Sequence, residues 1–118
     1  MNRKPITAKT HGIIDYALGS VLMAAPSMLP MNKKARNTYL GVAAGMSGLN
    51  SMTDTPVGIK RSLSFKDHQK ADAGLLAGMA LLAATPMIRK DRTALYFHLG
   101  FLALAALHYV LTDYNETI

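Results

Sequence analysis

The basic residues of this chain divide it into long windows that contain neither lysine nor arginine. All 13 Lys and Arg residues fall into short clusters within residues 3–9, 33–36, 60–70 and 89–92. The windows between and after these clusters are residues 10–32, 37–59, 71–88 and 93–118. A helix of about 20 mainly apolar residues crosses a hydrocarbon core of about 30 Å. The pattern therefore predicts four membrane-spanning helices, near residues 11–30, 37–53, 69–87 and 93–112.

A soluble four-helix bundle is the alternative fold, and the distribution of polar residues argues against it. Such a bundle should present a polar face with the 3.6-residue period of the helix. Residues 75–84 and 100–107 are instead apolar around the whole helix. The windows therefore predict an all-α membrane protein, and the length of 118 residues predicts a single domain over residues 1–118. The absence of cysteine excludes disulfides and thiolate metal sites.

The net charge of +6 does not indicate a nucleic-acid-binding protein. A nucleic-acid-binding face places basic residues along one helix or alternates them with aromatic residues, whereas these clusters flank apolar segments. The predicted partner is therefore the lipid bilayer. Seven basic residues fall on the side of the termini and six on the other side, and on this small difference we place both termini in the cytoplasm.

The two halves of the chain repeat the same order of residues. HGIIDYALGSVLMAAPSM and YLGVAAGMSGLNSMTD in the first half correspond to HQKADAGLLAGMALLAATPM and HLGFLALAALHYVLTD in the second. Equivalent residues lie 57 to 60 positions apart, for example His11 and His68, Asp15 and Asp72, Pro26 and Pro86, and Asp54 and Asp113. Repeat 1 is predicted at about 10–58 and repeat 2 at about 67–116. Each is a helical hairpin, and a pseudo-two-fold axis along the membrane normal relates the two parallel hairpins.

This pattern resembles the SPW-repeat family of small bacterial membrane proteins, in which each repeat is a pair of transmembrane helices. The matching features are the Asp-to-Gly opening of each first helix, the proline near its end, and the glycine early in the second helix. Ala-Pro-Ser and Thr-Pro-Met stand where the family has Ser-Pro-Trp. The resemblance implies a multi-pass protein of the bacterial inner (cytoplasmic) membrane. It implies an architecture and no biochemical activity.

Parallel hairpins bring the start of each first helix and the end of each second helix to one side of the membrane. Six polar residues should therefore share this edge: His11, Asp15, Asp54, His68, Asp72 and Asp113. His108, one helical turn before Thr112, is a further candidate. Under the first interpretation these residues close the bundle by hydrogen bonds that include Thr53 and Thr112, and the chain is a structural or interaction protein without a cofactor.

The alternative interpretation is a protein that binds or transports a proton, a cation or a metal ion through this edge. Histidine nitrogens and carboxylate oxygens are ligands for zinc and other divalent ions, and such chains also relay protons. A haem bound between His11 and His68 is a third hypothesis. The sequence has no phosphate-binding loop and no serine with a convincing base, so an enzyme is not predicted.

Small and aromatic residues predict how the helices contact each other and the membrane surface. Gly41 and Gly45, and Gly74 and Gly78, are spaced to allow close approach of helices in lipid, within the chain or in a homo-oligomer or larger membrane complex. The tyrosines all fall near the predicted span ends, where they should act as interfacial anchors: Tyr16, Tyr39, Tyr96, Tyr109 and Tyr114.

Overall fold

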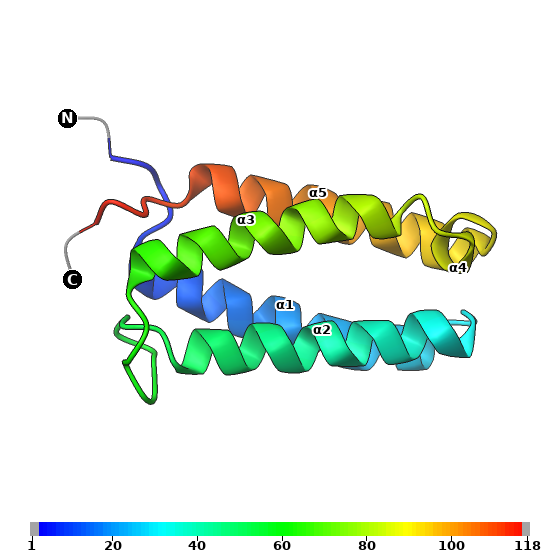
Figure 1. Ribbon diagram of the computed structural model, residues 1–118, viewed down its shortest axis with the longest axis horizontal. Coiled ribbons are helices and arrows are strands. Elements are labelled where there is room, and N and C mark those ends of the chain that lie inside the picture. The colour runs from blue at the N-terminus through cyan, green and yellow to red at the C-terminus, as the bar shows by residue number, and fades with distance from the viewer. Residues whose placement is uncertain (1–2, 117–118) are drawn as a thin grey trace.

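The computed structural model describes residues 3–116 and consists of α-helices (Figure 1). The helices are α1 (Ala8–Met28), α2 (Lys33–Ser51), α3 (Phe65–Leu82), α4 (Pro86–Arg89) and α5 (Arg92–Leu111). Over the described residues there are two isolated β-bridges and no strand, which confirms the all-α prediction. The four long helices correspond to the four predicted ones. The short helix α4 was not predicted.

Side-chain caps fix where the long helices begin. The first backbone N–H groups of a helix lack intrahelical partners, and a Ser, Thr, Asn or Asp side chain accepts a hydrogen bond from one of them. Each long helix has such a cap, namely Thr7, Asn32, Ser64 and Asp91. Three of the helices therefore begin three or four residues earlier than predicted, because the prediction left out the basic residues that occupy their first turns.

The long helices form two antiparallel hairpins, α1 with α2 and α3 with α5, which lie alongside each other (Figure 1). The molecule measures 44 × 28 × 19 Å. The start of α1, the end of α5 and the loop between α2 and α3 lie at one end, and α4 and the turn between α1 and α2 lie at the other. The starts of α1 and α3 and the ends of α2 and α5 thus share one end of the bundle.

Short extended segments join the two hairpins at that end. Ile6, before α1, forms a parallel bridge with Thr112, after α5, and Leu63, before α3, forms one with Thr53, after α2. The bonds of the first bridge are Ile6 N–H to Leu111 O at 3.1 Å and Asp113 N–H to Ile6 O at 2.8 Å. Equivalent bonds in the second bridge join Leu63 to Met52 and Asp54 at 2.9 and 2.7 Å. Both bridges therefore follow the residue offsets of the sequence repeat.

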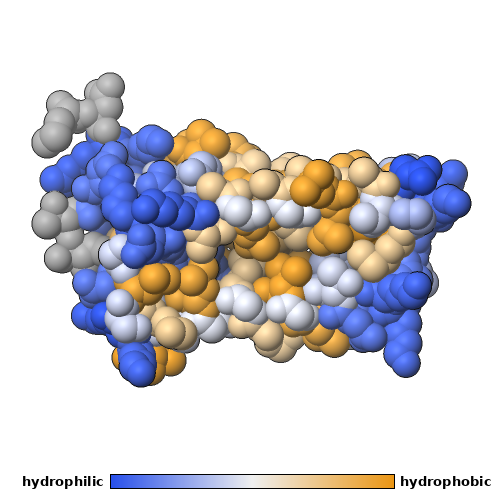
Figure 2. Space-filling model, viewed as in Figure 1, coloured by the Kyte–Doolittle hydropathy of each residue, from blue (hydrophilic) through white to orange (hydrophobic). Residues whose placement is uncertain are grey.

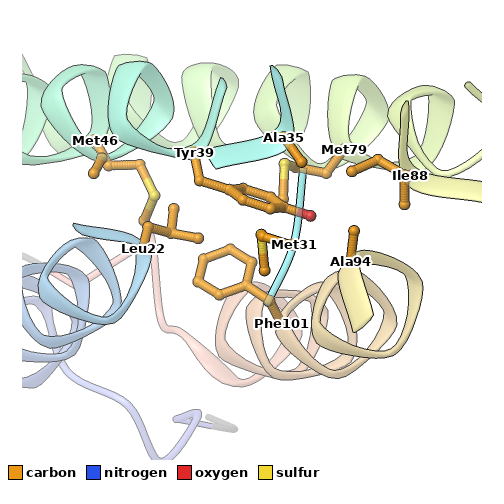
Figure 3. Close-up of a cluster of buried hydrophobic side chains, with 10 residues drawn as sticks. Leu22, Met31, Ala35, Tyr39, Met46, Met79, Ile88, Ala94 and Phe101 are labelled. Carbon is orange, nitrogen blue, oxygen red and sulfur yellow. The ribbon is translucent and has the colours of Figure 1, made fainter. Parts of the chain in front are cut away.

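A cluster of buried apolar side chains fills the middle of the bundle and the end that carries α4 (Figure 3). Tyr39 lies among Met31, Met79 and Phe101 and is fully buried, so its prediction as an interfacial anchor is wrong. The His98 Nε2–H donates to the Met79 carbonyl at 2.6 Å, and the Tyr39 hydroxyl donates to His98 Nδ1 at 2.7 Å. These bonds satisfy the polar atoms of both rings and allow the burial.

The mean hydropathy of the individual helices does not support all four predicted membrane spans. Within residues 3–116, α5 alone is long and apolar enough by itself to cross a membrane, and one such helix is weak evidence for membrane insertion. The four-membrane-helix part of the fold prediction is therefore not supported for α1, α2 and α3. Their mean hydropathy is lowered by polar residues, including a His–Asp pair in each of α1 and α3.

The predicted glycine faces do not mediate helix contacts within the chain. Gly41, Gly45, Gly74 and Gly78 are exposed, and a Cβ atom placed on any of them meets nothing within 4 Å. The close approach occurs at other glycines, in α1. A Cβ on Gly19 would lie 2.6 Å from Ser47 Oγ of α2, and one on Gly12 would overlap Val57. Contact of the exposed glycines with a second molecule stays a prediction.

Candidate metal centre

Two histidines and two aspartates from the first turns of α1 and α3 converge in the interior of the bundle. His11 and Asp15 lie at i and i+4 on α1, and His68 and Asp72 lie at i and i+4 on α3, so each pair projects from one helix face. One donor atom from each of these residues lies within 4.8 Å of the other three. Four of the six predicted edge residues are thus brought together.

Five of the six distances among the four donor atoms lie between 2.9 and 3.2 Å. The Nε2 atoms of His11 and His68 are 3.2 Å apart. Asp15 Oδ2 lies 3.1 Å from His11 Nε2 and 2.9 Å from His68 Nε2, and Asp72 Oδ2 lies 3.1 and 3.2 Å from the same atoms. Four N or O ligands in a tetrahedron around an ion at about 2.0–2.1 Å are about 3.3–3.4 Å apart. The five distances given above are a few tenths of an ångström shorter, so such an ion would move these ligands outward, and one oxygen of each carboxylate lies within 4.8 Å of the other.

The remaining two predicted residues lie outside this cluster. Asp54 is exposed, and the Asp113 carboxylate accepts a hydrogen bond from the Asn115 N–H at 3.1 Å. Both residues follow the end of a helix and belong to the extended segments that form the β-bridges. Successive side chains of an extended segment point to opposite sides. The inward positions are therefore taken by the preceding residues, Thr53 and Thr112, which are fully buried.

These two threonines fix the orientation of the histidine rings. His11 Nδ1 lies 2.7 Å from Thr112 Oγ1, and His68 Nδ1 lies 2.7 Å from Thr53 Oγ1. Each hydroxyl donates its own hydrogen to a backbone carbonyl, of His108 and Leu49 respectively. A hydroxyl has only one hydrogen, so each oxygen must accept a bond from the imidazole Nδ1–H. In the neutral rings both Nε2 atoms therefore carry a lone pair directed into the cluster.

Two further side chains hold the carboxylates. His108 Nε2 lies 2.9 Å from Asp15 Oδ1 and donates to it, and the Tyr114 hydroxyl donates to Asp72 Oδ2 at 2.7 Å. Burial, with the nearby Asp72 carboxylate adding to it, raises the pKa of Tyr114, so this hydroxyl keeps its proton and acts as a donor. Tyr114 is 5% exposed, so its prediction as an interfacial anchor is wrong.

Three aromatic rings pack against the His11 ring. The His108 ring stacks on His11 with centroids 4.0 Å apart and an interplanar angle of 16°. Phe65 and Tyr114 approach His11 edge-on, at 5.5 and 5.3 Å. Tyr114 has no signal in the sequence that could have placed it here, because it follows the last helix and belongs to no periodic pattern.

The chemistry of the cluster calls for a positive charge at its centre. Two nitrogen lone pairs and two carboxylate oxygens about 3 Å apart repel one another unless a proton or a metal ion lies among them. The side chains of His11 and His68 are 1% and 0% exposed, and those of Asp15 and Asp72 are 6% and 14% exposed, so water screens this repulsion little. The haem hypothesis does not fit, because the carboxylates occupy the space that a macrocycle between the rings would need.

Comparisons with known protein families, with curated proteins and with solved structures give no match to this chain.

Proposed function

We propose that this chain is an integral membrane protein that binds one divalent metal ion, best fitted by zinc, between its two helical hairpins. The observation that carries the proposal is the convergence of His11, Asp15, His68 and Asp72, with both histidine Nε2 lone pairs directed inward by Thr112 and Thr53. Metal-binding histidines use one ring nitrogen for the ion and the other for such a hydrogen bond. Mixed nitrogen and oxygen ligands in tetrahedral geometry favour zinc.

The outer surface of the bundle supports a location in the membrane. No exposed side chain is charged within residues 11–28, 38–51, 71–82 and 93–111. Figure 2 shows the resulting hydrophobic belt between two hydrophilic ends. The exposed serines in this belt, Ser20 and Ser27, donate to the carbonyls four residues before them at 2.9 and 3.1 Å, which reduces the cost of placing their hydroxyls in lipid.

Part of the polar content that lowers the hydropathy of three helices faces the interior, and exposed basic residues such as Lys33, Lys34 and Lys66 lie in the first turns of α2 and α3. His11, Asp15, Asn50 and His68 are all buried, whereas lipid would contact only the outer surface of each helix. A bundle with an uncharged belt and a polar interior is better suited to lipid than to water. We therefore keep the four-span topology as a proposal, and the resemblance to the SPW-repeat family adds the bacterial inner membrane as its location.

The proposed ion has a structural role. Four protein ligands complete a tetrahedral coordination sphere, which is typical of structural zinc sites, whereas catalytic sites leave a position for water or substrate. Two ligands come from each hairpin, so the ion would cross-link the halves of the molecule. A shared proton network in place of the ion is the second candidate, since the same four atoms could share protons.

Metal analysis of the purified protein tests the proposal. We expect about one zinc per chain in protein prepared with a histidine-free tag, and loss of that zinc in His11→Ala and His68→Ala. His98→Ala is the control, because His98 is also buried and hydrogen-bonded but lies outside the cluster. Metal-free wild-type protein whose unfolding temperature does not respond to added zinc would support the proton network instead.

A further inference from the structure

An apolar cavity of about 280 Å³ adjoins the candidate metal centre. It lies between α2 and α3, the two helices seen one above the other in Figure 1. Its walls are Val42, Gly45, Met46, Leu49, Ala71 and Leu75. Among the described residues that line the cavity, Asp15 and Asp72 are the charged ones. The cavity therefore leads from the hydrophobic belt to two of the proposed metal ligands. It is slightly smaller than most small-molecule sites, which measure about 300–1,000 Å³.

The side of the centre that faces this cavity is its most accessible side. Asp72 lines the cavity and is 14% exposed, more than any of the other three proposed ligands. A neighbouring space of about 20 Å³, enough for a hydroxyl, shares Asp15, Met46, Asp72 and Leu75 with the cavity and is also lined by His108 and Tyr114. His108 Nδ1 is buried and has no hydrogen-bond partner within the described residues. Nε2 of this ring donates to Asp15, so Nδ1 is the one ring nitrogen left without a hydrogen-bond partner.

The charge of the centre limits what the cavity can bind. Two carboxylates balance one divalent ion, and the two imidazoles are neutral, so the occupied centre has no net charge. An anionic ligand would leave an unbalanced charge in a medium of low dielectric constant, which is costly. A neutral ligand has no such cost, and a hydroxyl, which can donate or accept, supplies the hydrogen-bond partner that His108 Nδ1 lacks.

We propose that this cavity binds the hydroxyl end of a neutral lipid alcohol, whose hydrocarbon chain extends between α2 and α3 into the bilayer. This inference rests on the proposed metal-binding function, because the hydroxyl approaches the centre from the Asp72 side. The small volume fits one end of such a molecule and leaves the remainder of its chain in lipid.

The visible spectrum of bound Co²⁺ tests this inference, because a hydroxyl that contacts the Asp72 carboxylate changes how this ligand binds the ion, and the spectrum depends on the ligands and their geometry. The protein is loaded with Co²⁺ in phosphatidylcholine nanodiscs and titrated with dodecan-1-ol, dodecane or dodecanoate. We expect dodecan-1-ol to change the spectrum to saturation, and dodecane and dodecanoate to leave it nearly unchanged. Equal responses to dodecane and dodecan-1-ol would mean that any hydrocarbon fills the space and would overturn the inference, as would no response to the alcohol.

Matched glycine variants locate the binding. Gly45→Leu places a side chain at the cavity wall. Gly41→Leu places one a helical turn away, at a residue that does not line the cavity. A Cβ atom at either position meets nothing within 4 Å. We expect Gly45→Leu to weaken the response to dodecan-1-ol by about tenfold or more, because the new side chain occupies ligand space, and Gly41→Leu to preserve it. Ala71→Leu and Ala73→Leu form a second such pair on α3.

Equal effects of the two variants of a pair would overturn the inference. Cobalt uptake is measured first in every sample, which separates the two proposals. Protein that takes up cobalt and ignores the alcohol contradicts the lipid-alcohol site alone, whereas protein that takes up no cobalt contradicts the proposed metal-binding function as well.

Discussion

Thr53 and Thr112 determine what the histidines of the cluster can bind. Each accepts the Nδ1–H of a histidine and so leaves the opposite nitrogen of that ring free to act as a ligand. Neither threonine would touch the ion. Their contribution is to orient the rings and to fix the tautomers.

Replacement of these hydroxyls by methyl groups should weaken metal binding while preserving side-chain volume. In Thr53→Val and Thr112→Val, one histidine Nδ1–H loses its acceptor, and we expect the metal dissociation constant to rise about 10- to 100-fold. Serine at either position retains the hydroxyl and should retain most of the affinity. Competition with a coloured chelator measures the constants, and unchanged affinity in both valine variants would contradict the role of the threonines.

Tyr114 should slow release of the ion through its bond to Asp72. Tyr114→Phe removes this bond but keeps the ring that packs on His11 and Phe65. We expect metal release to a chelator to become about tenfold faster, a typical effect of losing a partner of a metal ligand. Tyr109→Phe is the control, because the Tyr109 ring packs on Tyr114 but Tyr109 is not one of the four proposed ligands, and it should release metal at the wild-type rate.

The sequence repeat is sufficient to predict the four residues of the cluster. It does not predict correctly the positions of Asp54, Asp113 and Tyr114. His11, Asp15, His68 and Asp72 lie inside helices, where the i, i+4 spacing fixes their common face. Asp54 and Asp113 lie just beyond helix ends, where a change to extended backbone turns them away from the cluster. Helical periodicity carries no information about such positions, and the same limit applies to Tyr114.

Among the helices, α1 and α2 form the most extensive contact, and Gly19 of α1 lies against α2 within it. Gly19→Ala would place a methyl group 2.6 Å from Ser47 Oγ, too close for two atoms that are not bonded. We expect this variant to unfold with a free energy about 1 kcal/mol lower than that of the wild type, the low end of the usual cost of overpacking, because the overlap involves one side-chain atom and no backbone atom.

The control for this variant is Gly41→Ala, since Gly41 is exposed and helical. Its new methyl group meets no other atom within 4 Å. Alanine is favoured over glycine in a helix by about 0.5–1 kcal/mol, so this change should be neutral or stabilising. Denaturant unfolding in mixed micelles compares the two proteins. Equal stabilities would show that the contact between α1 and α2 tolerates a larger residue.

The whole molecule combines an uncharged outer belt with polar groups inside. The positions of the basic clusters along the sequence indicate the uncharged belt better than the mean hydropathy of each helix does. The basic clusters delimit all four windows, and the clusters lie at the two ends of the bundle (Figure 2). Mean hydropathy per helix identifies only α5 as a candidate span, because inward-facing His and Asp lower the average of α1 and α3, and basic residues in the first turns lower that of α2 and α3. The separation of inward-facing from outward-facing residues requires the three-dimensional arrangement.

Acidification should release the metal and weaken the association of the hairpins. Histidine binds a metal ion only when its Nε2 is unprotonated, so protons compete with the ion and metal affinity falls as the pH is lowered. At neutral pH, zinc at about 100 times its dissociation constant should stabilise the fold by about 2.7 kcal/mol. Thermal unfolding with and without zinc, at pH 7.5 and at pH 5, measures both effects. A zinc-dependent shift of equal size at both pH values would contradict ligation by the histidines.

X-ray absorption at the zinc edge of the protein, purified in detergent without added chelator, tests the central claim most directly. We expect four nitrogen or oxygen ligands at about 2.0–2.1 Å, with the outer-shell scattering of two imidazole rings, and loss of that signal in the His11→Ala and His68→Ala variants. A zinc-free sample, or a six-oxygen shell without imidazole scattering, would contradict the assignment of this cluster as a metal centre.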